Sequence, residues 1–184
     1  MNHFLRALMV ALLVTAGASA AELRWSGAVD DNFMTPGNWT IGTTGVPSTA
    51  SPTTNDVCLI QDLGFRPHLR SAVPGAIRLD VGISNTQDAF LYIEDGGSIP
   101  DLTNYGYHLM PRRGAVYQSG GTVNTGSRNV WFHQGRSSNT GTGIYEMTGG
   151  TWTKSSGTLT FLNRPVAPAH ASLRVLGGTF SNLG

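Results

Sequence analysis

A glycine pair followed by threonine recurs through the second half of this chain at nearly constant spacing. Three copies lie 29 and 28 residues apart, and a related Gly-Gly-Ser lies 24 residues before the first. The repeat-defining residues are Gly96, Gly97, Gly120, Gly121, Thr122, Gly149, Gly150, Thr151, Gly177, Gly178 and Thr179. A self-similar period in this range is typical of repeat architectures, in which each unit packs against its neighbours. No other feature of the sequence limits the fold as strongly.

Apolar residues keep a fixed register around each glycine pair. Large side chains stand four residues before the pair and three residues after its first glycine: Val116, Tyr145 and Leu173, then Val123, Trp152 and Phe180. Variable or charged residues alternate with them, which indicates strands with one buried face. A second strand aligns at 29 residues, Val130 with Leu159. In the Gly96 copy, Leu91 and Ile93 are one place out of frame, which predicts a β-bulge or a poorer repeat near the cap.

The unit length favours stacked coils. Two or three strands of five or six residues with their turns use about 25 to 30 residues. No apolar stripe of helical spacing survives ten residues without Gly or Pro, so helices do not fit. The predicted fold class is all-β, a β-solenoid of about four coils over residues 76–184, preceded by an irregular cap and loop-rich first coils over 21–75. A meander of hairpins fits the local pattern too and is the competing architecture.

The N-terminus predicts export. Arg6 is followed by an apolar run over residues 7–14 and by Ala18-Ser19-Ala20. This order is that of a secretory signal peptide over residues 1–20, cleaved before Ala21. The alternative is a membrane anchor, but the run is shorter than the roughly 20 apolar residues that span a bilayer. We therefore expect a bacterial, Sec-exported protein, secreted or at the cell surface, with no transmembrane segment in the mature chain.

Charge and cysteine content limit which binding partners and which disulfides are expected. Without Arg6, 11 basic residues balance 11 acidic ones. A neutral chain lacks the basic face that nucleic acids or anionic membranes require, so neither is an expected partner. The single cysteine, Cys58, excludes an internal disulfide framework. It lies in an apolar run, where burial as a small hydrophobe is favoured over pairing between chains.

No set of residues has the spacing of a catalytic or metal centre, so no enzyme activity or cofactor is expected. Asp30-Asp31-Asn32 fits a cation site or, preferably, an Asx turn. A mild acidic cluster surrounds the first glycine pair: Asp80, Asp88, Glu94, Asp95 and Asp101. It is where a calcium-dependent polysaccharide lyase would be sought, although solvated loop charges are the simpler interpretation. Arg112-Arg113 is likewise a solvated loop pair or a grip on an acidic sugar, and the histidines are scattered without ligand spacing.

Two aromatic residues are candidates for glycan contact. Trp131 and Tyr117 stand on outward positions if their neighbours face the core. Exposed rings stack on sugars through their broad apolar faces. The alternative is that lateral loops cover both rings.

The N-terminal half adds a family resemblance. It contains, in order, Trp25-Ser26-Gly27, a segment Phe33–Trp39 that ends Pro-Gly-Asn-Trp, Val46-Pro47 and Asp56-Val57-Cys58-Leu59-Ile60. With the Gly-Gly-Thr strands, this resembles secreted bacterial proteins with autotransporter-associated β-strand repeats, many of which carry a PEP-CTERM sorting tail. The resemblance implies a right-handed parallel β-helix at, or shed from, the cell surface. The chain stops after the third Gly-Gly-Thr without a sorting tail, so a C-terminal truncation is expected.

Three functions follow as expectations. The first is a non-enzymatic structural or adhesive surface protein. The second is a polysaccharide-binding or lyase-like β-helix, whose partner is an extracellular polysaccharide. The third is the N-terminal spacer of a larger autotransporter-like protein.

Overall fold

The chain forms an all-β fold in which parallel strands predominate. The computed structural model describes residues 20–54, 56–61, 63–75, 77–82, 88–100, 110–111, 113–127, 129–131, 141–161 and 170–182. The predicted signal peptide lies almost wholly outside them. Their one helical element is η1 (Pro36–Asn38), a single 3₁₀ turn, which agrees with the predicted lack of helices. None of the described helical structure is long and apolar enough to cross a bilayer.

Three larger sheets and one strand pair make up the fold. The first sheet runs, in spatial order, through β3 (Val46–Pro47), β2 (Trp39–Ile41), β1 (Glu22–Trp25), β4 (Val57–Ile60), β6 (Arg78–Val81) and β9 (Met110–Pro111). The second runs through β16 (His170–Val175), β13 (Thr142–Met147), β10 (Gly114–Gln118), β7 (Ala89–Ile93) and β5 (His68–Leu69). The third runs through β17 (Thr179–Asn182), β14 (Thr151–Lys154), β11 (Thr122–Asn124) and β8 (Ser98–Ile99). The strand pair is β12 (Val130–Trp131) with β15 (Leu159–Thr160).

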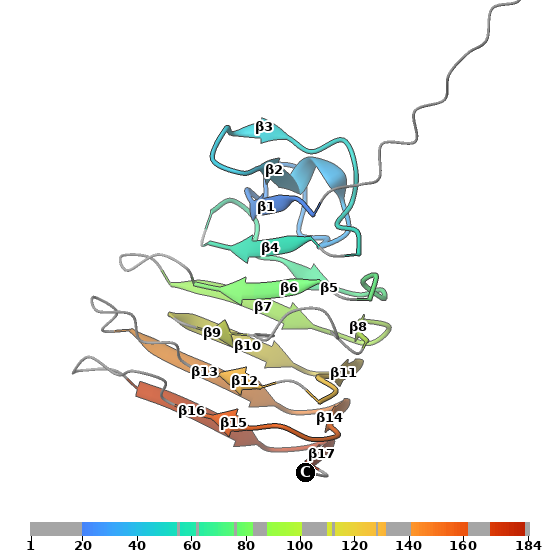
Figure 1. The fold of residues 1–184 in the computed structure, drawn as a ribbon, viewed down its shortest axis with the longest axis vertical. Coiled ribbons are helices and arrows are strands. Elements are labelled where there is room, and N and C mark those ends of the chain that lie inside the picture. The colour runs from blue at the N-terminus through green and yellow to red at the C-terminus, as the bar shows by residue number, and fades with distance from the viewer. Residues whose placement is uncertain are drawn as a thin grey trace, which may run out of the picture.

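The repeats pair in parallel and in register. Strands β7, β10, β13 and β16 lie one above another, and β8, β11, β14 and β17 follow the same order in the third sheet (Figure 1). Val116 pairs with Tyr145, and Tyr145 pairs with Leu173, as the repeat predicts. Val130 pairs with Leu159, also as predicted. A hairpin meander is therefore wrong for the repeats; antiparallel pairing among the named strands joins only β1 to β2 and β2 to β3.

The glycine pairs are turns that join the second sheet to the third. In the three Gly-Gly-Thr copies the second glycine has positive φ, for example 76° at Gly150 and 80° at Gly178, whereas in the Gly96-Gly97 pair it is the first glycine, with φ 84°. This left-handed backbone is costly for residues that carry a Cβ. A Cβ on Gly149 would overlap Ser119 O, and one on Gly150 would overlap Gly120 O, because successive turns touch. Both positions therefore require glycine, the first for close approach and the second for conformation as well.

The first copy differs in its turn and not in its strand. Leu91 pairs with Val116 and Ile93 with Gln118, without interruption of the ladder. Ser98 then pairs with Thr122, so four residues separate β7 from β8 where three separate β10 from β11. The predicted β-bulge is wrong: the extra residue is in the turn Glu94–Gly97, closed by a hydrogen bond from Gly97 N to Glu94 O of 2.9 Å.

The inward faces of the second and third sheets build the repeat core. Leu91, Val116 and Tyr145 are buried in one ladder, and Ile99, Val123 and Trp152 are buried in another. Two polar side chains in this core bond to each other and to the backbone: the Tyr145 hydroxyl donates to Gln118 Oε1 (2.6 Å), and Gln118 Nε2 donates to Thr151 O (3.1 Å). Burial raises the pKa of Tyr145 well above its ordinary value, so the hydroxyl stays protonated.

The cap is organised by three buried aromatic rings. Trp39 meets Phe33 and Trp25 edge to face, with ring centroids 4.9 Å and 5.1 Å apart. Their indole nitrogens donate to backbone oxygens, Trp39 Nε1 to Phe33 O (2.7 Å) and Trp25 Nε1 to Phe65 O (2.6 Å). Gly27 has φ 55°, and a Cβ there would overlap Phe65. The Trp-Ser-Gly and Pro-Gly-Asn-Trp motifs thus hold one aromatic cluster above the stacked strands.

Candidate functional site

The outward face of the second sheet carries an aromatic strip, which we define as His68, Phe90, Tyr92 and Tyr117. These residues alternate with buried ones along their strands, so their side chains leave the core. The register places His68 beside Tyr92 and Tyr92 beside Tyr117 on adjacent strands. The sequence predicted an outward Tyr117 but did not identify its three neighbours.

The rings of the strip are nearly parallel. Centroids are 4.6 Å apart for His68 and Tyr92, with planes at 11°, and 5.3 Å apart for Tyr92 and Tyr117, with planes at 22°. Phe90 and Tyr117 are 6.4 Å apart with planes at 10°. The Arg66 guanidinium lies 4.0 Å from the Phe90 centroid, an arrangement that gains cation–π attraction. The rings of the strip therefore stack on one another as an aligned column and are not a set of independent side chains.

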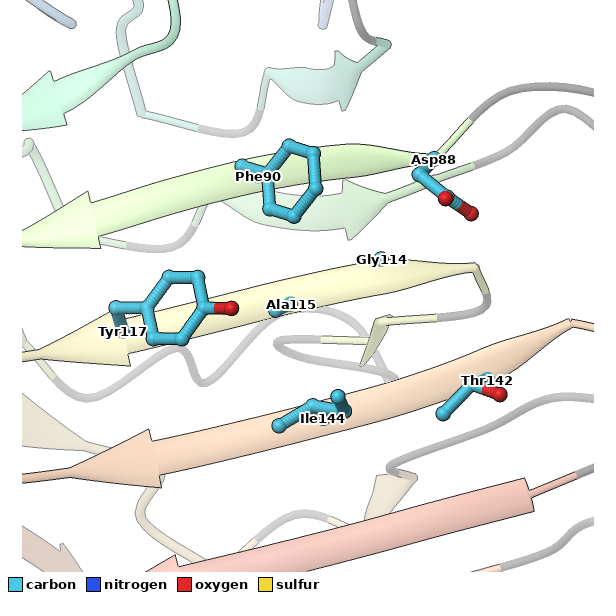
Figure 2. A pocket seen from close by; sticks show the side chains of 7 residues that line it. All are labelled: Asp88, Phe90, Gly114, Ala115, Tyr117, Thr142 and Ile144. Carbon is cyan, nitrogen blue, oxygen red and sulfur yellow. The ribbon is translucent and has the colours of Figure 1, made fainter.

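A shallow pocket of about 110 Å³ lies at the end of this strip (Figure 2). Its floor is the backbone and small side chain of Gly114 and Ala115. Phe90, Tyr117 and Ile144 form its apolar walls, and Figure 2 shows the Tyr117 hydroxyl directed over Ala115. Asp88 and Thr142 add polar groups at one side. The residues that line the pocket are therefore Asp88, Phe90, Gly114, Ala115, Tyr117, Thr142 and Ile144.

The pocket exists because one strand carries small residues between two that carry large ones. Ala115 pairs with Phe90 on one side and with Ile144 on the other. Gly114 cannot be larger, because its φ is 136° and a Cβ there would overlap Ala89 O. The depression is therefore fixed by the register of three strands.

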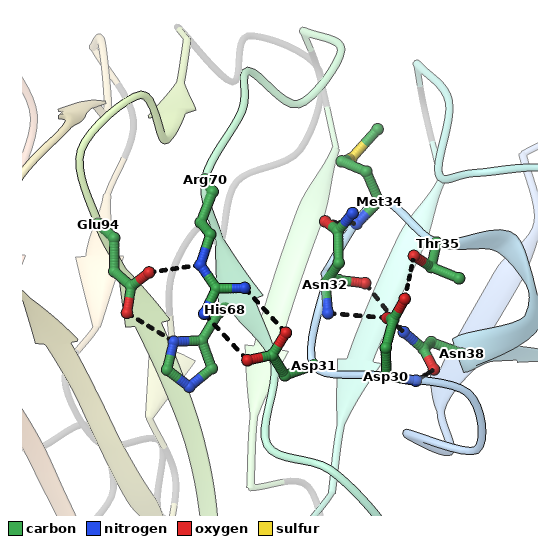
Figure 3. Close-up of polar contacts among 9 residues, drawn as sticks. All are labelled: Asp30, Asp31, Asn32, Met34, Thr35, Asn38, His68, Arg70 and Glu94. Atoms are coloured by element: carbon green, nitrogen blue, oxygen red, sulfur yellow. Dashed lines mark hydrogen bonds and ion pairs between the residues drawn. The ribbon is translucent and has the colours of Figure 1, made fainter.

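Acidic side chains around the strip are paired with cations. Asp31 forms a two-point ion pair with Arg70 (2.8 and 2.9 Å), and Arg70 also donates to Glu94 (2.6 Å), as Figure 3 shows. Glu94 accepts a contact of 2.6 Å from His68 Nδ1. Farther along, Arg113 pairs with Asp88 (2.7 Å). Arg174 pairs with Glu146 (3.2 Å).

The pairing shifts the pKa of two carboxylates. Hydrogen bonds from Arg70 lower the pKa of Asp31. Partial burial raises the pKa of Glu94, but hydrogen bonds from His68 and Arg70 outweigh it, so the net pKa is lowered. Asp31 in turn raises the pKa of Arg70. This network stays ionised near neutral pH, and it ties the cap to the second sheet.

Asp30 is used as a turn residue. Its carboxylate accepts from Asn32 N (2.9 Å), Thr35 Oγ1 (3.0 Å) and Asn38 Nδ2 (Figure 3). Burial raises the pKa of Asp30, but these hydrogen bonds together lower it by more, so the net pKa is below its ordinary value. The preferred Asx-turn interpretation is confirmed. Within the described ranges, no three His, Cys, Asp or Glu side chains are grouped as metal ligands would be.

The predicted acidic cluster is dispersed. Asp80 is buried on β6 of the first sheet and pairs with Arg78 (2.6 Å). Asp88 and Glu94 flank opposite ends of β7, and Asp95 lies in the following turn. Asp101 is outside the described residues. Sequence proximity suggested a cluster, but strand β7 separates Asp88 from Glu94, and Asp80 lies in the first sheet.

The backbone of Trp131 belongs to β12, in a different sheet from Tyr117 on β10, so the two do not form one strip along a sheet. Arg113 is ion-paired, whereas Arg112 lies outside the described residues. Cys58 is fully buried, as expected, and burial raises its pKa well above the ordinary value, with Asp56 and Asp80 adding to the shift.

The histidines remain apart where they are described. His68 stacks on Tyr92, and His170 is exposed on β16. His108 and His133 lie outside the described residues. Sequence reasoning missed the buried Lys154, which faces the core on β14 and donates to Ser156 O. Its position two residues after the inward Trp152 was the available signal.

The chain was compared with protein-family models, curated proteins and solved structures. None matched. The resemblance to autotransporter-associated repeat proteins therefore remains a prediction from the motifs alone.

Proposed function

We propose that this chain is an exported, non-enzymatic β-solenoid that serves a structural or adhesive role outside the cell or on its surface. The observation that carries the proposal is the in-register parallel pairing of β7, β10, β13 and β16. Each coil presents the same backbone ladder to the next. A stack of this kind is stiff, and it exposes side chains laterally for contact.

The finer architecture belongs to the same proposal. We infer a right-handed parallel β-helix of about four coils over residues 76–184, capped by 21–75. Support comes from the two ladders that run side by side and from turn-to-turn hydrogen bonds such as Thr151 N to Gly121 O and Thr179 N to Gly150 O, both 2.9 Å. Export is inferred from the leader pattern of residues 1–20, and surface location from the motif resemblance.

The enzymatic alternative has less support. A lyase of the β-helix type requires carboxylates gathered to hold calcium beside a basic residue. Here Asp88, Glu94 and Glu146 are each engaged by an arginine, and Asp80 is buried in another sheet. The aromatic strip favours polysaccharide binding over turnover as the second candidate. The third candidate, a spacer within a longer autotransporter-like protein, is compatible with the same fold.

The proposal is tested by expressing the full chain in a Gram-negative host. We expect it in the extracellular or surface fraction, with an N-terminus at Ala21, and cells that display it should attach to surfaces better than cells without it. A chain lacking residues 1–20 is the matched control and should stay in the cytoplasm. Retention of the full chain in the cytoplasm, or turnover of uronic polysaccharides with calcium, would overturn the proposal.

A further inference from the structure

We propose that the pocket formed by Phe90, Tyr117 and Ile144 over Ala115 binds a single pyranose unit of a neutral polysaccharide. The inference rests on the proposed surface role, and it names the class of partner that such a surface would contact. The pocket is too small for a drug-sized ligand, since such sites enclose about 300–1,000 Å³. It suits one ring of a chain whose other units lie outside it.

The chemistry of the walls fits a sugar ring. A pyranose has apolar C–H faces and a rim of hydroxyl groups. Phe90 and Tyr117 both line the pocket and their rings lie within 10° of parallel, so a sugar ring seated there packs against aromatic carbon from both. Ile144 adds an aliphatic wall, while Thr142, Asp88 and the Tyr117 hydroxyl offer donors and acceptors to a hydroxyl rim. An amphipathic ring satisfies both kinds of wall, whereas a wholly apolar ligand would leave the polar groups without water.

The charges select a neutral sugar. Asp88 beside the pocket is held by Arg113, and Glu146 on the next strand is held by Arg174. Each pair sums to zero, so a uronate or sulfate would have to displace a carboxylate to reach Arg113 or Arg174. An acidic polymer would compete with Asp88 for Arg113, and like-charge repulsion from that carboxylate would oppose it. A neutral glycan meets neither penalty.

Binding is measured by calorimetry on the full chain with cellohexaose, xylohexaose, mannohexaose and chitohexaose, and with oligogalacturonate as the acidic comparison. We expect at least one neutral oligosaccharide to bind and the uronate to bind roughly tenfold more weakly or not at all. Tyr117→Ala should weaken the neutral ligand roughly tenfold, because a wall of the site is lost.

Two further variants keep the test decisive if Tyr117→Ala fails to fold. Ala115→Val fills the floor without removing a ring and should also weaken binding roughly tenfold. Tyr117→Phe keeps the ring and should retain most of the affinity. The control is Phe161→Ala, which removes an exposed aromatic side chain outside the pocket and should bind as the wild type does.

Three results would overturn the proposal: no neutral oligosaccharide binds, the uronate binds as tightly, or Ala115→Val leaves affinity unchanged. These results are separable from failure of the surface role. A chain that is exported yet binds no sugar refutes the pocket alone. A chain that stays in the cytoplasm yet binds a neutral sugar when purified refutes the surface role alone.

Discussion

The indole of Trp152 lies flat against the ring of Phe180, with centroids 4.2 Å apart and planes at 2°. The two residues occupy the same position on successive strands of the third sheet, one pairing with the other across β14 and β17. The stacked pair lies on the inward face of the repeats, where Phe180 packs against the hydrophobic core. Trp152 Nε1 is buried there without a hydrogen-bond partner.

Trp152→Ala is expected to destabilise the chain by about 3–5 kcal/mol, because it opens a cavity beneath Phe180. Trp152→Phe should cost about 1 kcal/mol or less, since it keeps a stacked ring and removes an unpaired buried donor. Urea unfolding followed by circular dichroism measures both. Both variants remove Nε1, so the difference between them reports the stacked ring, and equal losses would contradict its contribution.

The turn glycines allow a matched comparison. Gly150 and Gly45 have similar positive φ, 76° and 72°, but a Cβ on Gly45 would have no heavy atom within 4 Å, whereas one on Gly150 would overlap the Gly120-Gly121 turn. Gly45→Ala should cost about 1–2 kcal/mol from backbone conformation alone. Gly150→Ala should cost a further ~2 kcal/mol from the clash. The difference in urea midpoint reports how closely successive glycine turns approach; similar losses would refute contact between turns.

The Asp31–Arg70–Glu94 network predicts acid sensitivity. The pKa values of Asp31 and Glu94 are lowered by folding, so the stability that these groups contribute is present above their unfolded pKa values of about 4 and is lost as the pH falls through the folded values. The groups are partly exposed, so the contribution is about 1 kcal/mol or less. Melting temperatures between about pH 3 and pH 7 should fall with acid more steeply in the wild type than in Arg70→Gln.

A coupling test isolates this network. In the double variant Asp31→Asn/Glu94→Gln, the further change Arg70→Gln should alter the melting temperature little at any pH in that range, because no carboxylate remains to pair. A large effect of Arg70→Gln in that background would assign the stabilisation to the arginine's packing and not to its charge.

The buried Lys154 predicts a second pH dependence, which arises from a desolvated cation and not from paired carboxylates. Burial lowers its pKa below the unfolded value of about 10.4, so between the two pKa values the unfolded chain binds more protons and stability rises with pH. Lys154→Met removes this cost and should stabilise the chain by about 1 kcal/mol at neutral pH. Its advantage over the wild type should shrink as the pH rises toward the unfolded pKa of about 10.4, which differential scanning calorimetry measures. A constant difference would show that Lys154 does not titrate abnormally.

The strand pairing of the repeats could be predicted, because side chains of the same kind recur at equivalent positions of each repeat. Val116, Tyr145 and Leu173 share a register that their spacing from the glycine pair reveals. The same alignment misplaced Leu91 and Ile93, because it counted from the glycines, whereas the strand is anchored by its own pairing. A turn can accommodate an extra residue without any change in the alternation of apolar residues along the strands.

The candidate site was predicted only in part, and for the same reason. Once Leu91 is paired with Val116, Tyr92 falls beside Tyr117 and the aromatic strip follows. Without that correction, Tyr117 was joined to Trp131, which belongs to another sheet. The ion pairs were beyond prediction, because Asp31 and Arg70 are 39 residues apart and meet only through the stacking of the cap on the second sheet.

The extra residue in the turn Glu94–Gly97 has an evolutionary consequence. Paired residues on successive strands of the second sheet lie 25, 29 and 28 residues apart in the sequence, yet every pair of strands keeps its register. Length changes between strands therefore do not disturb the register of the neighbouring strands. A gene of this kind can gain or lose codons in its turns and connections one repeat at a time, and selection can reshape those segments while the paired strands are inherited unchanged.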